Sequence, residues 1–325
     1  MIRIVRSLAV AVVCGVLIVG CGAGQSNHRA AGVPNSKGIV APKSSAAAGT
    51  QSMVMVPAAG LDTRGARVRL FMIASRLNGE TIPELVVTPA GSAMRRRPLL
   101  VLLHPLVDDW RSTLTDAMFA ALARLGPAAP DIVIPYSPTD SYWHDRAGQP
   151  PNYETRGAWG SYVVSEVIPR AIALLHADPR RIAIAGDSMG GFGALDIARL
   201  YPGMFCAVAA HSPALFSSYS YSEPHSHTES APGNFDNAGD FARHDLLIAA
   251  AAGLNLYGRT QVWIDAGSRD WHVAADRTLA RLLRKDGSRV QFHVWPGEHD
   301  EAYWESHENQ YFHFYATALS HCPVT

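Results

Sequence analysis

The sequence predicts an α/β protein whose sheet is doubly wound and mostly parallel, with helices on both faces. From residue 98 onward, short apolar runs alternate with stretches of helical spacing, a rhythm typical of parallel sheets with crossover helices. The run 98–103 is continuously apolar, as in strands that are buried on both faces. About 270 residues follow an atypical N-terminus, which is the size of one large domain.

Strands are expected where apolar and β-branched residues run between turn signals, at residues 67–73, 85–88, 98–103, 131–134, 181–185, 206–210, 261–264 and 290–295. Helices are expected where apolar residues recur at helical spacing, at residues 112–125, 160–176, 190–200, 276–285 and 302–319. Between about residues 217 and 246 the alternation lapses into polar residues and glycine. We interpret this segment as an insertion over the C-terminal edge of the sheet, where a lid or substrate loop would act.

The composition gives no indication of a nucleic-acid partner or a cofactor. Hydrophobic residues make up 48% of the chain and charged residues 17%, which is enough apolar material for a large core. The 28 basic and 28 acidic side chains balance, so no nucleic-acid partner is expected. No cofactor is expected either.

The N-terminus has the pattern of an export signal. Arg3 and Arg6 precede an apolar run at 8–19, which is too short to span a membrane. Residues 18–21, Ile-Val-Gly-Cys, resemble the bacterial lipoprotein box, in which the cysteine is diacylated and becomes the mature N-terminus. We therefore expect residues 1–21 to be a signal peptide ending at lipidated Cys21. An ordinary cleaved signal and an uncleaved anchor are the alternatives.

The predicted lipid on Cys21 would hold an exported protein at the outer face of the bacterial plasma membrane. Residues 22–55 are rich in Ala, Gly, Ser and Asn without apolar periodicity, so we expect a flexible tether. The catalytic domain is then expected to span residues 56–325. Outside the cytoplasm, Cys206 and Cys322 can form a disulfide, although a buried free thiol at Cys206 is an equally ordinary outcome.

Residues 186–190, Gly-Asp-Ser-Met-Gly, lie where an expected strand becomes an expected helix. A serine in G-x-S-x-G at such a junction forms a sharp turn that exposes its hydroxyl, and both flanking positions need glycine. The sequence therefore predicts Ser188 as a nucleophile. The backbone N–H of Met189, at the helix start, is expected to face the developing oxyanion.

A serine nucleophile needs a base that is oriented by an acid, and on this kind of sheet both follow the serine in the chain. Asp265 abuts the strand 261–264, whereas Asp270 lies in the loop beyond it, where such an acid normally sits. We favour Asp270 and regard Asp265 as the structural alternative. His299 follows the last strand and is the expected base, because the other downstream histidines lie within a strand, on the terminal helix or too close to Asp270.

A second oxyanion donor is expected from the loop after strand 98–103. Pro105 has no N–H, so Leu106 is the candidate.

At these segments the chain resembles the esterase D family of the α/β-hydrolase fold, which takes in S-formylglutathione hydrolase, feruloyl esterases and the mycobacterial mycolyltransferases. The resemblance covers roughly residues 80–320. It is carried by Gly-Asp-Ser-Met-Gly-Gly-Phe-Gly-Ala-Leu (186–195), Asp-Pro-Arg-Arg (178–181), Glu-Val-Ile-Pro (166–169) and Gly-Glu-His-Asp (297–300) followed by Tyr303 and Trp304. It implies an enzyme that acts on esters or transfers acyl groups, with the family roles on Ser188, Asp270, His299, Leu106 and Met189.

The chain also departs from that family. His104-Pro105 replaces the common His-Gly, and Val107-Asp108-Asp109 replaces the Arg that mycolyltransferases tend to carry there. A secreted serine ester hydrolase acting on an ester substrate is therefore the leading hypothesis. The alternatives are an acyltransferase of mycolyltransferase type on envelope lipids or glycolipids, and a non-catalytic envelope-binding lipoprotein.

Aromatic side chains beside the motif loops are candidates for a substrate groove. Trp110 and Trp143 are the ones we select, although core packing explains most such aromatics equally well. The polar stretch with His225 and His227 is interpreted as a solvated surface, and no metal site is expected.

Overall fold

The computed structural model describes residues 53–58, 60–91, 96–106, 110–147, 156–220 and 231–322, all within one compact unit, Gly49–Thr325. The predicted signal peptide, Cys21 and nearly all of the predicted tether lie outside the described residues. The tether prediction runs slightly too far, because strand β1 (Val54–Met55) already pairs with β2 (Arg67–Ala74).

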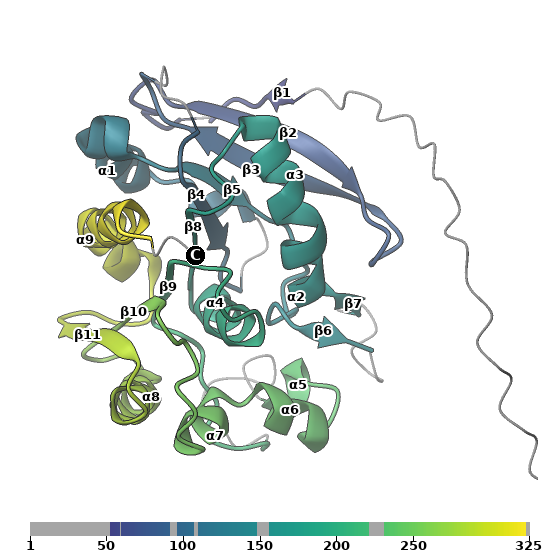
Figure 1. Cartoon of the computed structure of the whole chain (residues 1–325), viewed down its shortest axis with the longest axis vertical. Coiled ribbons are helices and arrows are strands. Elements are labelled where there is room, and N and C mark those ends of the chain that lie inside the picture. The colour runs from purple at the N-terminus through teal and green to yellow at the C-terminus, as the bar shows by residue number, and fades with distance from the viewer. Residues whose placement is uncertain are drawn as a thin grey trace, which may run out of the picture. The chain divides into compact units, whose positions relative to one another are not determined.

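The core of the unit is a nine-stranded sheet in the order β1-β2-β3-β5-β4-β8-β9-β10-β11 (Figure 1). The first three pairings in that order are antiparallel and the remaining five are parallel. The strands after β2 are β3 (Thr81–Thr88), β4 (Leu99–Leu103), β5 (Asp131–Ile134), β8 (Ile182–Asp187), β9 (Ala207–His211), β10 (Gln261–Gly267) and β11 (Arg289–Trp295). The expected mostly parallel sheet is therefore present, and its parallel strands bring their carboxyl ends to one edge.

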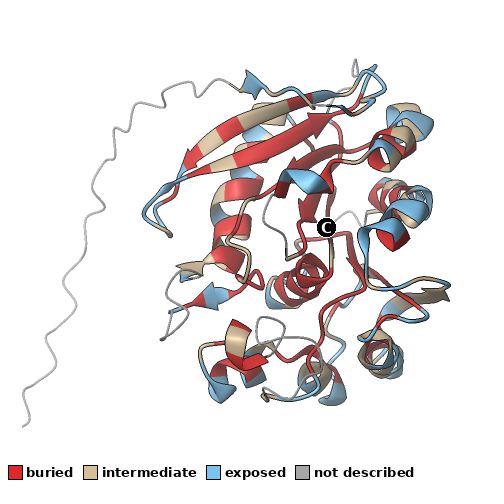
Figure 2. Cartoon of the chain, turned by 180° about the vertical axis from the view of Figure 1, so that it is seen from behind, coloured by how far each residue is buried: buried red, intermediate tan, exposed pale blue. Residues whose placement is uncertain are grey.

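Helices cover both faces of this sheet (Figure 2). On one face lie α1 (Asp116–Leu125) and α9 (Glu301–Ser320), which share an apolar cluster with the sheet. The helices α2 (Trp159–Tyr162), α3 (Ile168–Leu175), α4 (Met189–Leu200) and α8 (Val273–Lys285) pack into the other cluster. Within the described part of the chain, no helix combines the length and apolarity that crossing a membrane requires.

The expected helix at 160–176 is interrupted by a π-helical segment, Val163–Val167. Pro169 follows it near the start of α3. Because proline has no N–H and its ring crowds the carbonyl four residues back, the wider hydrogen-bond spacing of a π turn accommodates it.

The described part of the insertion is not an irregular loop. It forms two short helices, α5 (Ala231–Asn234) and α6 (Ala238–His244), and α7 (Leu246–Ala251) follows it directly; Phe235 and Phe241 from the insertion join the main core. The prediction missed them because each helix is too short for apolar periodicity to be visible. A small two-stranded sheet, β6 (Asp145–Arg146) with β7 (Gly157–Ala158), was also not predicted.

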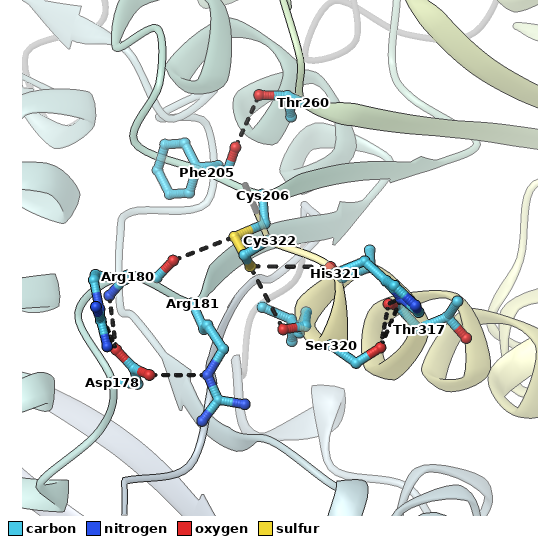
Figure 3. The surroundings of a disulfide bond; sticks show 12 residues. Asp178, Arg180, Arg181, Phe205, Cys206, Thr260, Thr317, Ser320, His321 and Cys322 are labelled. Atoms are coloured by element: carbon cyan, nitrogen blue, oxygen red, sulfur yellow. Dashed lines mark hydrogen bonds and ion pairs between the residues drawn. A yellow bond between two sulfur atoms is a disulfide. The ribbon is translucent and has the colours of Figure 1, made fainter. Parts of the chain in front are cut away.

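A disulfide joins Cys206, just before β9, to Cys322, just after α9 (Figure 3). The two Cα atoms are 5.2 Å apart, and 116 residues separate the cysteines in sequence. The question that the sequence left open is thus answered in favour of the bridge. It ties the end of the terminal helix to the start of β9.

Replacing Cys322 by serine should lower the free energy of unfolding by about 2–5 kcal/mol, because the bridge closes a long loop and so restricts the unfolded chain. Urea unfolding of wild type and Cys322→Ser, each with and without reductant, measures this change. Reductant should destabilise only the wild type, and the double variant Cys206→Ser/Cys322→Ser is the matched control. Equal midpoints for oxidised and reduced wild type would show that the bridge does not stabilise the fold.

Candidate active site

Ser188 occupies a sharp turn between β8 and α4, with φ 51° and ψ −115°. A non-glycine residue rarely has a positive φ, and such strain concentrates at functional sites. The turn demands glycine on both sides. A Cβ at Gly190 would lie 2.1 Å from the carbonyl oxygen of Leu103, and one at Gly186 would lie 2.4 Å from the carbonyl carbon of Gly190.

The side chains of Ser188, His299 and Asp270 form one hydrogen-bonded chain. Nε2 of His299 lies 2.8 Å from Oγ of Ser188, and Nδ1 lies 2.9 Å from Oδ2 of Asp270. Asp270 follows β10, and His299 lies between β11 and α9. All three residues that we predicted from the sequence thus meet at the edge of the sheet where the parallel strands have their carboxyl ends. With the proton on Nδ1 donated to Asp270, the free electron pair of Nε2 faces the serine hydroxyl.

Asp270 is a buried carboxylate, 3% exposed. Burial alone would raise its pKa, but the hydrogen bond and charge of His299 and the backbone N–H of His272 outweigh burial and hold the pKa below its usual value. That N–H donates to Oδ1 over 2.7 Å. Asp270 therefore stays ionised and can orient His299 and stabilise its protonated form.

Asp265, the competing carboxylate, is fully buried and has hydrogen-bond partners of its own. Its Oδ1 lies 2.6 Å from Nδ1 of His211 and accepts the indole N–H of Trp263 over 2.7 Å. Its Oδ2 accepts the hydroxyls of Tyr303 and Tyr311, each over 2.8 Å. These four partners occupy the carboxylate and tie β10 to α9, which supports a structural role.

The other downstream histidines have separate partners. Nδ1 of His272 donates to the carbonyl of Leu215 over 3.0 Å. His307 stacks on Trp295, with ring centroids 4.4 Å apart. Within the described residues, His299 is the histidine that contacts Ser188.

Leu106 and Met189, the predicted oxyanion donors, lie beyond the carboxyl ends of two neighbouring strands. Leu103 of β4 pairs with Gly186 of β8, and each candidate follows three residues later. Met189 begins α4, where the first N–H groups of the helix have no partner within it. The two backbone N–H groups thus belong to segments that flank Ser188.

The loop that carries Leu106 is fixed by His104, which is 1% exposed. Its Nδ1–H donates to the Pro105 carbonyl over 2.7 Å, and Nε2 accepts the N–H of Ser137 over 3.3 Å. Burial lowers the pKa of His104 to about 4, so the ring is neutral at pH 7. A neutral ring can both donate and accept, as this loop requires.

The expectation that Trp143 and Trp110 line an open groove does not hold. Trp143 is fully buried, packs on Gly193 of α4 and donates its indole N–H to the His104 carbonyl over 3.2 Å. Trp110 is 6% exposed and lies in the cluster shared by α1 and α9. Core packing, the alternative that the sequence left open, explains both.

Trp271 is the large aromatic that the sequence-based selection missed. It is 42% exposed, and its ring centroid lies 4.5 Å from that of His299. Its position directly after Asp270 was the available signal. The side chain shields one face of the His299 imidazole.

The family model Esterase, described as "Putative esterase", matches residues 75–310. No curated protein matches the chain. Among solved structures, a ferulic acid esterase superimposes with a TM-score of 0.62 at 22% identity, covering 78% of this chain and 98% of that one. An S-formylglutathione hydrolase from Agrobacterium tumefaciens superimposes with a TM-score of 0.59 at 20% identity, covering 78% of this chain and 96% of that one.

A third structure, fluorophosphonate-binding serine hydrolase F of Staphylococcus aureus, gives a TM-score of 0.61 at 18% identity, covering 77% of this chain and 98% of that one. At these identities the structural matches show a shared fold. The family match extends over most of the chain and contains Ser188, Asp270 and His299. The chain therefore belongs to this esterase family.

Proposed function

We propose that the chain is a carboxylic-ester hydrolase on a doubly wound α/β-hydrolase sheet, in which Ser188, His299 and Asp270 form the catalytic triad. The observation that carries this proposal is the hydrogen-bonded chain from Ser188 through His299 to Asp270. A positive φ at the serine and an ionised, buried carboxylate behind the histidine fit the same role.

In the first half-reaction, His299 Nε2 accepts the hydroxyl proton of Ser188 while Oγ bonds to the ester carbonyl carbon. The carbonyl oxygen becomes an oxyanion, which the N–H groups of Leu106 and Met189 stabilise. When the intermediate collapses, the bond to the alcohol oxygen breaks and His299 returns the proton to that oxygen. In the second half-reaction, His299 deprotonates a water molecule, which attacks the acyl-enzyme and releases the acid and Ser188.

A fluorophosphonate probe tests the nucleophile directly, since it bonds covalently to activated serine. We expect one label, on Ser188, together with hydrolysis of p-nitrophenyl esters of short to medium chain. Both signals should disappear in Ser188→Ala. Absence of labelling and of turnover in the folded wild type would instead favour the non-catalytic envelope-binding alternative.

Water rather than a sugar is the proposed acyl acceptor. Selecting a sugar hydroxyl over water, at roughly 55 M, requires a site that binds the sugar and excludes solvent. Val107-Asp108-Asp109, outside the described residues, supplies no cation that clamps a sugar. Product analysis with an activated ester and excess trehalose should give mainly free acid. Predominant acyl-trehalose would instead establish the mycolyltransferase-type alternative.

We also propose export and anchoring by lipid on Cys21. The Cys206–Cys322 disulfide supports export, because such bridges persist in oxidising compartments. Cys21→Ser should move the protein from the membrane fraction to the soluble fraction or stall its processing. Fractionation and mass spectrometry of the mature N-terminus measure this change, with Cys14→Ser as the matched control. Unchanged fractionation and processing of Cys21→Ser would exclude Cys21 as the attachment point.

A further inference from the structure

A pocket beside the nucleophile is lined by four carboxylates: Asp187, Glu301, Glu305 and Glu308. Asp187 ends β8, directly before Ser188, and the three glutamates lie along α9. The pocket also contacts Pro105, the residue before the predicted oxyanion donor Leu106. It therefore lies within reach of a group attached to an ester bound at Ser188.

Trp304 connects this pocket to His299. It lines the pocket, and its ring stands edge-on to the His299 imidazole, with centroids 5.4 Å apart. His299 Nε2 is the atom that returns a proton to the departing alcohol. The pocket thus shares Trp304 with the surroundings of His299.

Four carboxylates gather in the pocket, and in the described part of the chain no direct ion pair joins any of them to Arg, Lys or His. Glu301, Glu305 and Glu308 are spaced i, i+4 and i+7, so they share one face of α9 and repel one another. Burial is the main cause that raises the pKa of Asp187 to about 6; the charge of Asp265 adds to this, and the charges of His211 and His299 oppose it. Burial and the charges of Asp187 and Glu305 raise the pKa of Glu308. A bound cation would relieve this repulsion.

Two polar atoms in the same pocket are buried without a hydrogen-bond partner among the described residues: Oγ1 of Thr113 and Nε1 of Trp304. Thr113 is 9% exposed and Trp304 8% exposed. A buried polar group without a partner destabilises the fold, so each such group calls for an explanation. The Trp304 N–H can only donate, so it needs a ligand atom that accepts, such as an oxygen.

We propose that this pocket binds the alcohol portion of the substrate when that portion carries an ammonium group, which the four carboxylates pair with, while an oxygen of the same ester accepts the N–H of Trp304. This proposal rests on the proposed ester hydrolysis at Ser188. It adds the substrate class, namely esters of cationic alcohols.

Choline butyrate and 3,3-dimethylbutyl butyrate test the proposal, because they have the same shape and differ only in charge. We expect kcat/KM to favour the choline ester by about tenfold or more, the ratio that one partly buried ion pair of about 1.4 kcal/mol gives. Free choline should bind in calorimetry and compete with p-nitrophenyl butyrate, whereas 3,3-dimethylbutanol should do neither.

Glu308→Gln should reduce this preference ratio by about tenfold, since the amide keeps the shape of the side chain but cannot become the carboxylate that pairs with a bound cation. Glu80→Gln, an exposed residue in the β2–β3 turn, is the matched control and should leave the ratio unchanged. Because the readout is a ratio of two substrates in one enzyme, a general loss of activity cancels. A ratio that is equally high in Glu308→Gln and wild type would overturn the assignment of the charge to this pocket.

The outcomes separate this proposal from ester hydrolysis itself. Hydrolysis of p-nitrophenyl butyrate without a choline preference and without choline binding would overturn the cation pocket and leave the esterase intact. Choline binding that Glu308→Gln weakens, in a protein that hydrolyses no ester, would support the pocket and overturn the proposed function. Binding of Ca²⁺ but not of choline would also overturn the pocket as proposed.

Discussion

Ser188→Ala should lower kcat/KM for p-nitrophenyl butyrate by about three orders of magnitude or more, while leaving the unfolding midpoint close to that of wild type. The variant lacks the atom that bonds to the acyl group, so only binding and the oxyanion donors remain to accelerate attack by water. Stopped assays at high enzyme concentration measure the residual rate, and urea unfolding checks the fold.

The triad also predicts how the losses combine. His299→Ala should lose about as much activity as Ser188→Ala, and the double variant should lose little more, because residues that act as one unit are not additive. Ser320→Ala, at the exposed end of α9, is the matched control and should keep wild-type kinetics. Turnover near wild type in Ser188→Ala would exclude Ser188 as the nucleophile. Losses that multiply in the double variant would mean that Ser188 and His299 act independently.

The mostly parallel sheet was predictable because its signals are local. Five-residue apolar runs such as Leu99–Leu103 are buried in full, which is what a continuous run implies. The sharp turn at Ser188 was predictable for the same reason, since G-x-S-x-G between a strand and a helix is itself a local pattern. These features depend on neighbours in sequence and on little else.

The features that the sequence did not reveal depend on contacts between distant segments. The groove assignment of Trp143 was wrong because its burial comes from α4, through Gly193, which lies 50 residues further along the chain. The acidic pocket went unnoticed because it joins the end of β8 to α9 and to the segment around Thr113. No spacing pattern in the sequence predicts that these three distant segments lie side by side.

Asp265 shows the limit of sequence reasoning within the site itself. Two carboxylates five residues apart both follow the strand expected at residues 261–264, and sequence position alone could only rank them; the structure places Asp265 inside β10 and Asp270 beyond it. The structure distinguishes them by their hydrogen-bond donors. Asp270 accepts a hydrogen bond from His299, whereas Asp265 accepts hydrogen bonds from His211 and three aromatic side chains. We therefore expect the same substitution, Asp to Asn, to lower mainly kcat at Asp270 and mainly the free energy of unfolding at Asp265.

Asp270→Asn should lower kcat by about 10⁴-fold with little change in stability, because an amide no longer holds the His299 proton on Nδ1 or stabilises the imidazolium. Asp265→Asn should do the reverse. Its amide nitrogen cannot accept, so buried donors such as the hydroxyls of Tyr303 and Tyr311 lose a partner, and the free energy of unfolding should fall by about 3–5 kcal/mol.

Each of these two variants is the matched control for the other, since the chemical change is identical. Steady-state kinetics below the unfolding temperature and urea unfolding give the two readouts. Activity per folded Asp265→Asn molecule should stay within about tenfold of wild type, because the Asp265 side chain bonds to His211 and three aromatic side chains rather than to a member of the triad. If Asp265→Asn abolished turnover in a stable protein while Asp270→Asn remained active, the acid of the triad would be Asp265. The hydrogen bond between Asp270 and His299 would then be structural rather than catalytic.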